Sequence, residues 1–245
     1  MDVIGIIPAR YGSSRLPAKA LADILGKPMI QHIYERAKEA SILDEVIVAT
    51  DDERIKSAVE KFNGKAVLTS REHTSGTERL TEVVFDLDVK VIVNIQGDEP
   101  LLHPSMVNDV AYALLENPKL VMSTLKHKIS EEADYNNPNV VKVVTDKDNF
   151  ALYFSRSPIP DISRKKEGLQ LNIYKHLGIY AYTKDFLLTF KGLKNSKLED
   201  AESLEQLRAL EHGYRIKVIE TKHDTVSVDT EADLNKVIRI LKQQS

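Results

Sequence analysis

Over the first half of the chain, short apolar runs alternate with segments whose apolar residues recur at helical spacing. The runs cover residues 3–7, 46–49, 66–68 and 91–95. Each segment between them presents one apolar face, as with Ile55, Ala58, Val59 and Phe62. Buried strands that alternate with amphipathic helices are typical of a parallel sheet covered by helices. The chain is therefore predicted to be an α/β protein.

The rhythm of the sequence changes after Asn117 and Pro118. Extended stretches at 120–125, 140–145 and 177–182 follow without long helices between them, which predicts a mixed or antiparallel arrangement. A chain of 245 residues can form one large α/β domain or two small ones. We expect one domain over 1–245, with a core of about 1–118 plus 200–245 and a lobe of about 119–199. The polar segment 161–172 is a mobile loop, an arm exchanged between subunits or a solvated turn.

Composition and charge exclude several classes of protein. The net charge of −3 gives no sign of a nucleic-acid partner. The sequence contains no cysteine, which rules out disulfide bonds, zinc held by cysteine and thiol catalysis. The apolar runs are of strand length and no charged leader precedes the first one, so we expect no membrane partner. These features predict a soluble, cytoplasmic protein.

The loop after the first predicted strand combines small residues with cations and contains no acid. The small residues are Gly12, Ser13 and Ser14, and the cations are Arg10, Arg15 and Lys19. Small residues let backbone N–H groups approach an anion closely, and the cations balance its charge. The loop therefore fits a cradle for a polyphosphate, although a solvated basic turn has the same composition. It lacks the glycine spacings of the P-loop and of the Rossmann fingerprint.

Two aspartates follow strand-like runs in distant parts of the sequence. Asp98 comes after the run at 91–95, and Asp229 comes after a short strand expected at 226–228. Ligands of open α/β sheets bind beyond the carboxyl ends of the strands. Carboxylates at that edge could hold Mg²⁺, which takes few protein oxygens and completes its shell with water and phosphate. Alternatively, Asp98 could cap a turn and Asp229 could cap the helix predicted over 230–241.

Other polar residues at element ends have structural interpretations. The first helix is expected to begin at Pro28, a residue that suits the first helical position. Asp51 and Asp52 also follow a strand, but Thr50 and Glu53 have the spacing of a capping box. We therefore favour a structural role for this pair of aspartates.

Four segments carry a resemblance that covers most of the chain: residues 6–30, 73–80, 96–101 and 227–234. They resemble the family of 3-deoxy-manno-octulosonate cytidylyltransferases, also called CMP-KDO synthetases. Ala18 and Ala20 depart from the family pattern, which has glycine and proline at these positions. Ala18 puts in question whether this loop needs a positive φ, a conformation that glycine adopts without strain.

The resemblance implies a fold, a reaction and a setting. The fold is a Rossmann-like three-layer nucleotidyltransferase fold with a mostly parallel central sheet and a smaller mixed lobe for sugar binding and dimerisation. The reaction transfers CMP from CTP to the anomeric hydroxyl of 3-deoxy-D-manno-octulosonate (KDO) and releases pyrophosphate, with Mg²⁺ as cofactor. The resemblance also implies a cytoplasmic homodimer whose product serves lipopolysaccharide inner-core synthesis.

The resemblance further implies site residues, each at a position that matches a family motif. The implied catalytic residues are Arg10, Arg15, Lys19, Asp98 and Asp229, and the last two are the implied metal ligands. The implied nucleotide-binding residues are Ala9, Arg10, Ser13, Ser14, Arg15, Lys19, Thr74, Ser75, Gly76 and Arg79. The implied sugar-binding residues are Gln96, Arg156, Arg164, His176, Tyr180, Glu205 and Gln206.

Three other interpretations of the sequence compete with this one. A CMP-sialate synthetase catalyses a related transfer, but its opening loop usually differs from residues 10–17. A nucleotide-binding sensor would have lost turnover, yet Lys19, Asp98 and Asp229 are all present. A purely structural α/β domain requires this set of charges at strand ends to be coincidental.

Overall fold

The computed structural model describes residues 1–12, 16–73 and 75–244, so Ser13, Ser14, Arg15 and Thr74 lie outside the described residues. The strands are β1 (Val3–Ala9), β2 (Asp23–Ile24), β3 (Lys27–Pro28), β4 (Glu45–Thr50), β5 (Ala66–Leu68), β6 (Val91–Asn94), β7 (Met122–Lys128), β8 (Lys142–Thr145), β9 (Ala151–Ser155), β10 (Tyr174–Thr183) and β11 (Lys217–Glu220). The helices are α1 (Met29–Lys38), α2 (Glu53–Lys61), α3 (Gly76–Val84), α4 (Pro104–Glu116), α5 (Glu132–Asn136), α6 (Lys184–Gly192), α7 (Lys197–Glu202), α8 (Gln206–Glu211) and α9 (Glu231–Gln244), with a 3-10 helix η1 (Lys19–Leu21).

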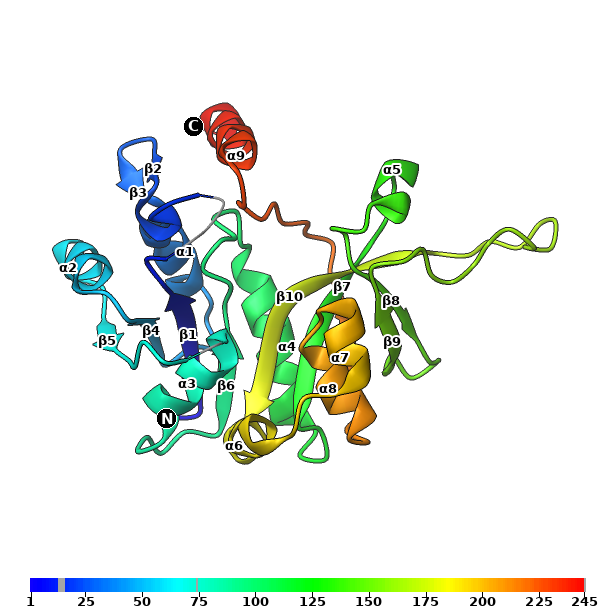
Figure 1. Ribbon diagram of the computed structural model, residues 1–245, viewed down its shortest axis with the longest axis horizontal. Helices are drawn as coiled ribbons and strands as arrows, with labels where there is room; N and C mark the ends of the chain where they lie inside the picture. Colours follow the sequence, from blue (N-terminus) through cyan, green and yellow to red (C-terminus); the bar gives the residue numbers. More distant parts are fainter. Residues whose placement is uncertain (13–15, 74, 245) are drawn as a thin grey trace.

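One mixed sheet crosses the whole molecule in the order β11-β7-β10-β6-β1-β4-β5, and β8 and β9 extend it beside β10 (Figure 1). Strand β1 is parallel to β4 and β6, with Ile6 opposite Ile47, and β5 is parallel to β4. Strand β10 is antiparallel to both β6 and β7. The predicted parallel first half and mixed second half are therefore confirmed.

Helices cover both faces of the sheet, which forms the middle of three layers. One hydrophobic core packs α1, α2, α4 and α9 against one face, and its members include Ile33, Val59, Val107 and Val237. The second core packs α3, α6 and α8 against the other face through Leu80, Phe186 and Leu207. None of the helices in the described ranges is long and apolar enough to cross a membrane. The three-layer α/β fold expected from the resemblance is confirmed.

The second half of the chain joins the central sheet directly, because β10 lies beside β6 and β7 lies beside β10. The division into a core and a lobe stays a prediction. The segment 161–172 connects β9 to β10 and extends away from the rest of the molecule (Figure 1). Its residues are almost all exposed, with Leu169 at 50% and Leu171 at 44% of full exposure.

Three local predictions were wrong. Residues 226–228 form no strand, because this stretch has no ladder with a neighbouring strand and only the Val228 N–H donates to the Asp98 carbonyl, at 2.8 Å. Pro28 is the N-cap of α1, in extended backbone, rather than its first helical residue. Asp52, and not Thr50, caps α2 by accepting a hydrogen bond from the Arg54 N–H.

Candidate active site

A pocket of about 340 Å³ lies beyond the carboxyl ends of β1 and β6. Four separate segments meet there: the loop after β1, the start of α3, the turn after β6 and the stretch before α9. This is the edge at which open α/β sheets bind ligands. Of the residues proposed from the sequence, the pocket is lined by Ala9, Arg10, Lys19, Ser75, Gly76, Arg79, Gln96, Asp98 and Asp229.

Two glycines let two of these segments close on the end of β1. A Cβ atom on Gly97 would lie 2.6 Å from the Pro8 carbonyl oxygen, a distance at which the backbone would have to move. A Cβ on Gly76 would lie 3.2 Å from the Pro8 ring. The turn that carries Asp98 and the first turn of α3 therefore converge on Pro8, which explains how distant motifs share one pocket.

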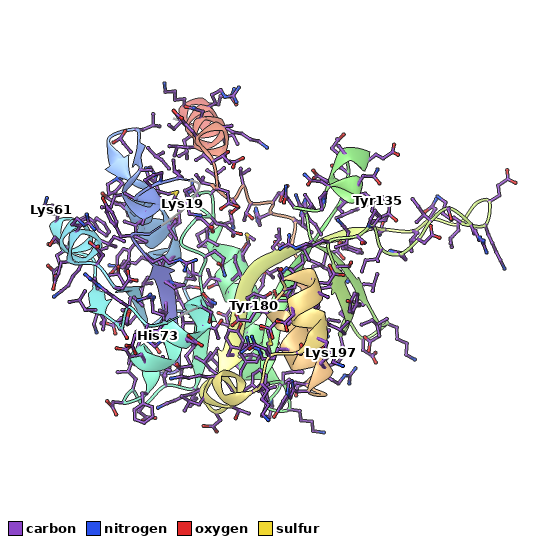
Figure 2. The ribbon with its side chains drawn as sticks, viewed as in Figure 1. Lys19, Lys61, His73, Tyr135, Tyr180 and Lys197 are labelled. Atoms are coloured by element: carbon purple, nitrogen blue, oxygen red, sulfur yellow. The ribbon has the colours of Figure 1, made fainter. Side chains whose placement is uncertain are left out.

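Lys19, which is labelled in Figure 2, forms ion pairs with both aspartates singled out from the sequence. Its Nζ donates to Asp98 Oδ2 at 2.8 Å and to Asp229 Oδ1 at 3.1 Å. The three side chains are 18%, 27% and 36% exposed, so the ion pairs are partly shielded from water. Two carboxylates converge on one cation at the edge of the pocket.

This pair of carboxylates suits a hard divalent cation. Mg²⁺ prefers oxygen ligands and keeps several positions for water and phosphate, so one or two carboxylates are enough. Among the described residues, no group of three or more histidine, aspartate or glutamate side chains could hold a metal ion. Asp98 and Asp229 already hold a positive charge between them, the ammonium of Lys19. The donor set therefore fits the metal that the sequence suggested.

The backbone conformation of Ala18 shows that the loop before Lys19 has a positive φ at this position. Ala18 has φ 53° and ψ 34°, in the left-handed region, and forms the N-cap of η1. An alanine in this region carries strain that a glycine avoids. The loop therefore keeps the left-handed conformation although the chain has no glycine here.

Asp229 does not cap the helix that follows it. Thr230 accepts a hydrogen bond from the Asp233 N–H, while Asp233 accepts from the N–H groups of Asp229 and Thr230. This reciprocal arrangement satisfies the start of α9. The alternative role of Asp229 as an N-cap is therefore wrong, and its carboxylate faces Lys19 instead.

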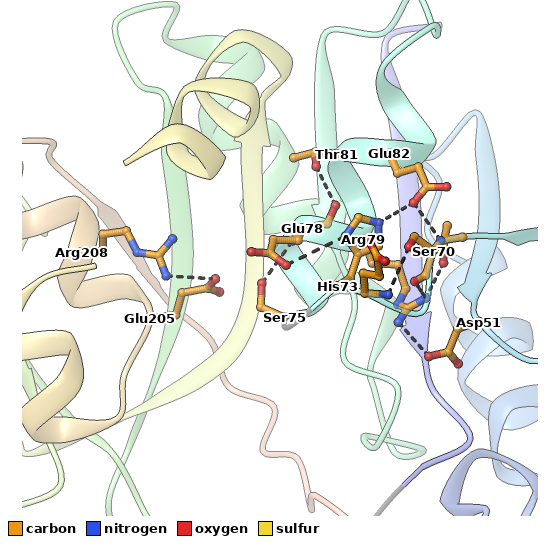
Figure 3. Close-up of polar contacts among 12 residues, drawn as sticks. Asp51, Ser70, His73, Ser75, Glu78, Arg79, Thr81, Glu82, Glu205 and Arg208 are labelled. Carbon is orange, nitrogen blue, oxygen red and sulfur yellow. Dashed lines mark hydrogen bonds and ion pairs between the residues drawn. The ribbon is translucent and has the colours of Figure 1, made fainter. Parts of the chain in front are cut away.

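Arg79, on α3, lines the pocket and is 3% exposed. Figure 3 shows its contact with Asp51. Its guanidinium donates to Asp51 Oδ2 at 3.1 Å, to the Ser70 carbonyl at 3.3 Å and to the Thr69 hydroxyl. The favoured structural role of Asp51 is thus confirmed, and it serves a residue that lines the pocket. The signal for Asp51 was its position directly after strand β4.

Glu99 is a buried carboxyl beside the pocket that sequence reasoning did not single out. Its side chain is 6% exposed, and burial together with the neighbouring Asp98 charge raises its pKa to about 8. At neutral pH Glu99 is therefore mostly protonated and adds little negative charge beside Asp98. The sequence signal that could have identified Glu99 was its position in the segment 96–101, beside Asp98.

Gln96 is the one proposed sugar-binding residue that lines this pocket, and its Nε2 donates to the Gly178 carbonyl at 2.7 Å. On β10, His176 Nε2 lies 3.0 Å from Thr124 Oγ1, and burial lowers the pKa of His176 to about 3. Burial raises the pKa of Tyr180 well above its usual value. Both groups are therefore neutral at neutral pH and offer hydrogen bonds rather than charge.

The two arginines proposed for the acceptor lie away from this pocket. Arg156 donates to the carbonyls of Glu202, Ser203 and Pro138, at 2.7, 3.3 and 3.2 Å. Arg164 is exposed on the segment 161–172. Neither guanidinium lines the pocket, so their roles toward an acidic sugar stay predictions.

Comparison with known proteins places this arrangement in a class. The model of the Cytidylyltransferase family matches residues 4–218. The chain therefore belongs to the cytidylyltransferase family.

Individual relatives and a solved structure give a more specific comparison than the family model. The 3-deoxy-manno-octulosonate cytidylyltransferase of Geotalea uraniireducens is 53% identical over 99% of this chain and 100% of that protein. The protein of the same name from Geobacter sulfurreducens is 51% identical, with the same coverage. The solved structure of CMP:2-keto-3-deoxy-manno-octonic acid synthetase complexed with CTP matches 100% of both chains at 46% identity, with a TM-score of 0.94. The resemblance identified from the sequence is confirmed.

Proposed function

We propose that this protein transfers CMP from CTP to the anomeric hydroxyl of KDO, forming CMP-KDO and pyrophosphate. The observation that carries the proposal is the convergence of Lys19, Asp98 and Asp229 at the edge of the pocket, with Nζ to oxygen distances of 2.8 and 3.1 Å. The names of its relatives and the CTP complex of a similar structure support the same substrates.

In this reaction the anomeric oxygen of KDO attacks the α-phosphorus of CTP in line. The new oxygen–phosphorus bond forms as the bond between the α-phosphorus and the bridging oxygen of the pyrophosphate breaks, and pyrophosphate leaves with that electron pair. The hydroxyl proton is lost to solvent. Such a transfer depends on positioning and on neutralising charge. Arg10 and Lys19 line the pocket, and we propose that they neutralise the phosphates together with Arg15.

Asp98 and Asp229 are proposed to hold Mg²⁺, with Lys19 as the residue that changes partners. When bound, the metal would neutralise phosphate charge and lower the pKa of the attacking hydroxyl. The Lys19 ammonium now lies between the two carboxylates. We propose that Lys19 moves from the carboxylates to the phosphates when CTP enters, because an ammonium pairs with either anion, and Asp98 and Asp229 are the residues that would hold Mg²⁺.

The nucleobase and the sugar are proposed to bind on opposite sides of the phosphates. Ser75, Gly76 and Arg79, with Thr74, would contact the cytidine through the start of α3. Gln96, His176, Tyr180, Glu205 and Gln206 would contact the sugar, with Arg156 and Arg164 as its candidate carboxylate partners. We further propose a cytoplasmic homodimer whose product serves lipopolysaccharide synthesis.

The proposal is tested by measuring pyrophosphate release from CTP and Mg²⁺ with KDO, with N-acetylneuraminate or with no acceptor. We expect release with KDO only, and its loss in Asp98→Asn. Asp86→Asn is the matched control, because Asp86 is an exposed carboxylate away from the pocket. Preference for N-acetylneuraminate would identify a CMP-sialate synthetase instead. Tight CTP binding without release under any condition would identify a nucleotide sensor.

A further inference from the structure

A hydrogen bond joins the start of α3 to the chain just before α8, 128 residues further along the sequence. The Thr77 hydroxyl donates to Glu205 Oε2 at 2.7 Å. Thr77 directly follows Ser75 and Gly76, which line the pocket, yet Thr77 itself is 3% exposed and does not line it. Thr77 therefore lies outside the pocket, where it supports the neighbouring residues that line it.

Several groups hold the Glu205 carboxylate in place. Burial raises its pKa, whereas the hydroxyls of Thr77 and Ser75 and the charge of Arg208 oppose that rise. Figure 3 shows Arg208 facing the Glu205 carboxylate. Arg208 is itself fixed by Glu199, with Nε to Oε2 at 2.8 Å. The Glu205 side chain still keeps 33% of its exposure, so it is accessible to a ligand.

The first turn of α3 is also held from its other side. Ser75 caps the helix by accepting from the Glu78 N–H at 3.2 Å, and Gly76 lies close against Pro8 at the end of β1. The turn is thus fixed between β1 and Glu205. A displacement of Glu205 would act on Thr77 and through it on the pocket wall.

We propose that Thr77 is a positioning residue that orients Glu205 toward the acceptor sugar and couples the acceptor site to the nucleotide pocket. This inference rests on the proposed function. A carboxylate with one oxygen held by Thr77 has its other oxygen directed, and so can accept hydrogen bonds from sugar hydroxyls at a defined angle. A freely rotating carboxylate would lose part of that interaction on binding.

The test compares Thr77→Val, Thr77→Ser, Glu205→Gln and the double variant Thr77→Val/Glu205→Gln in steady-state kinetics. Thr77→Val should raise the KM for KDO about tenfold, the loss expected for a hydrogen bond to a charged group, while kcat changes less. Thr77→Ser keeps the hydroxyl and should restore the wild-type KM. The double variant should be no worse than its more damaging single parent, because both changes remove one interaction.

Thr81 provides the matched control. It lies one turn further along α3, is 2% exposed, and its hydroxyl donates to the Glu78 carbonyl within the same helix at 2.6 Å. Thr81→Val should leave the KM for KDO unchanged, although it removes the same atom from an equally buried site. Thermal unfolding of each variant separates folding defects from kinetic ones.

The outcomes distinguish this inference from the proposed function. An unchanged KM in Thr77→Val, a rise of equal size in Thr81→Val, or failure of Thr77→Ser to restore the KM would overturn the positioning role while CMP transfer stands. Additive effects in the double variant would also overturn it. If Thr77→Val does not fold, an unaltered KM for KDO in Glu205→Gln would overturn the positioning role. Absence of pyrophosphate release by the wild-type protein would instead reject the proposed function.

Discussion

The pocket beyond β1 and β6 and the region around β8 and β9 each hold a cation, but in different ways. In the pocket, Lys19 lies between the carboxylates of Asp98 and Asp229. Near β8, Lys142 is fully buried and donates to the carbonyls of Asn137, Val140 and Arg156, at 2.9, 2.6 and 2.6 Å.

This difference indicates that Lys19 can change its partners, whereas Lys142 has a structural role. An ammonium between two carboxylates can transfer to another anion, because phosphate oxygens are equally good acceptors. An ammonium that satisfies three backbone carbonyls cannot leave without exposing them, and buried carbonyls without partners are destabilising. Arg156 is bound in the second way, because its guanidinium donates to the carbonyls of Glu202, Pro138 and Ser203.

The largest effect should follow from removing the exchangeable cation. Lys19→Met should reduce kcat by about 10²–10³-fold, as for loss of one group that stabilises developing charge. The same change should raise the affinity of the free protein for Mn²⁺ about tenfold, because the ammonium no longer competes for Asp98 and Asp229.

Electron paramagnetic resonance of free Mn²⁺ measures that affinity without turnover. Lys27→Met is the control, since Lys27 forms a largely exposed ion pair with Glu35 at 2.7 Å. If Lys19→Met bound Mn²⁺ no better than the wild type, Lys19 would not occupy the metal position.

Loss of the structural cation should act on stability instead. Lys142→Met should lower the free energy of unfolding by about 3 kcal/mol, because three buried carbonyls lose a charged donor. Chemical denaturation measures the change, with the exposed Lys147→Met as control. If Lys142→Met lowered the free energy of unfolding no more than Lys147→Met does, Lys142 would not be needed for the stability of the fold.

His176 predicts that the stability of the protein depends on pH. Its pKa falls from 6.5 to about 3 on folding because of burial, so the unfolded chain binds more protons between these values. Stability from this group is complete above pH 6.5 and is lost as the pH falls toward 3. Between pH 7 and pH 5 the loss should reach about 2 kcal/mol. Urea unfolding of wild type and His176→Gln at both pH values tests this, and equal slopes for the two proteins would contradict it.

The smallest effect should come from the backbone of the loop between β1 and η1. Ala18→Gly should stabilise the protein by about 1 kcal/mol, because glycine adopts the left-handed conformation without strain. Ala22 has φ −57°, so Ala22→Gly should instead destabilise. Melting temperatures compare the two, and a lower melting temperature for Ala18→Gly would show that this alanine carries no strain.

The sequence by itself determined the class of fold and the positions from which the pocket is built. The strand at 91–95 follows from a short apolar run, and the helix that carries Ile55 and Val59 follows from a spacing of 3.6 residues, both of which are local properties of the chain. Asp98 could be singled out because the residue after a buried strand is placed at the ligand-binding edge of the sheet. The resemblance added the reaction to this local information.

Only the tertiary structure decided which distant groups meet. Lys19 lies 79 residues from Asp98 and 210 from Asp229, and their contact depends on β6 lying beside β1 and on the Val228 hydrogen bond to Asp98. The same reason explains the wrong prediction of a strand. Residues 226–228 have the composition of a strand but no neighbouring strand. A local pattern specifies what an element can become, whereas its partners come from parts of the chain that the pattern does not contain.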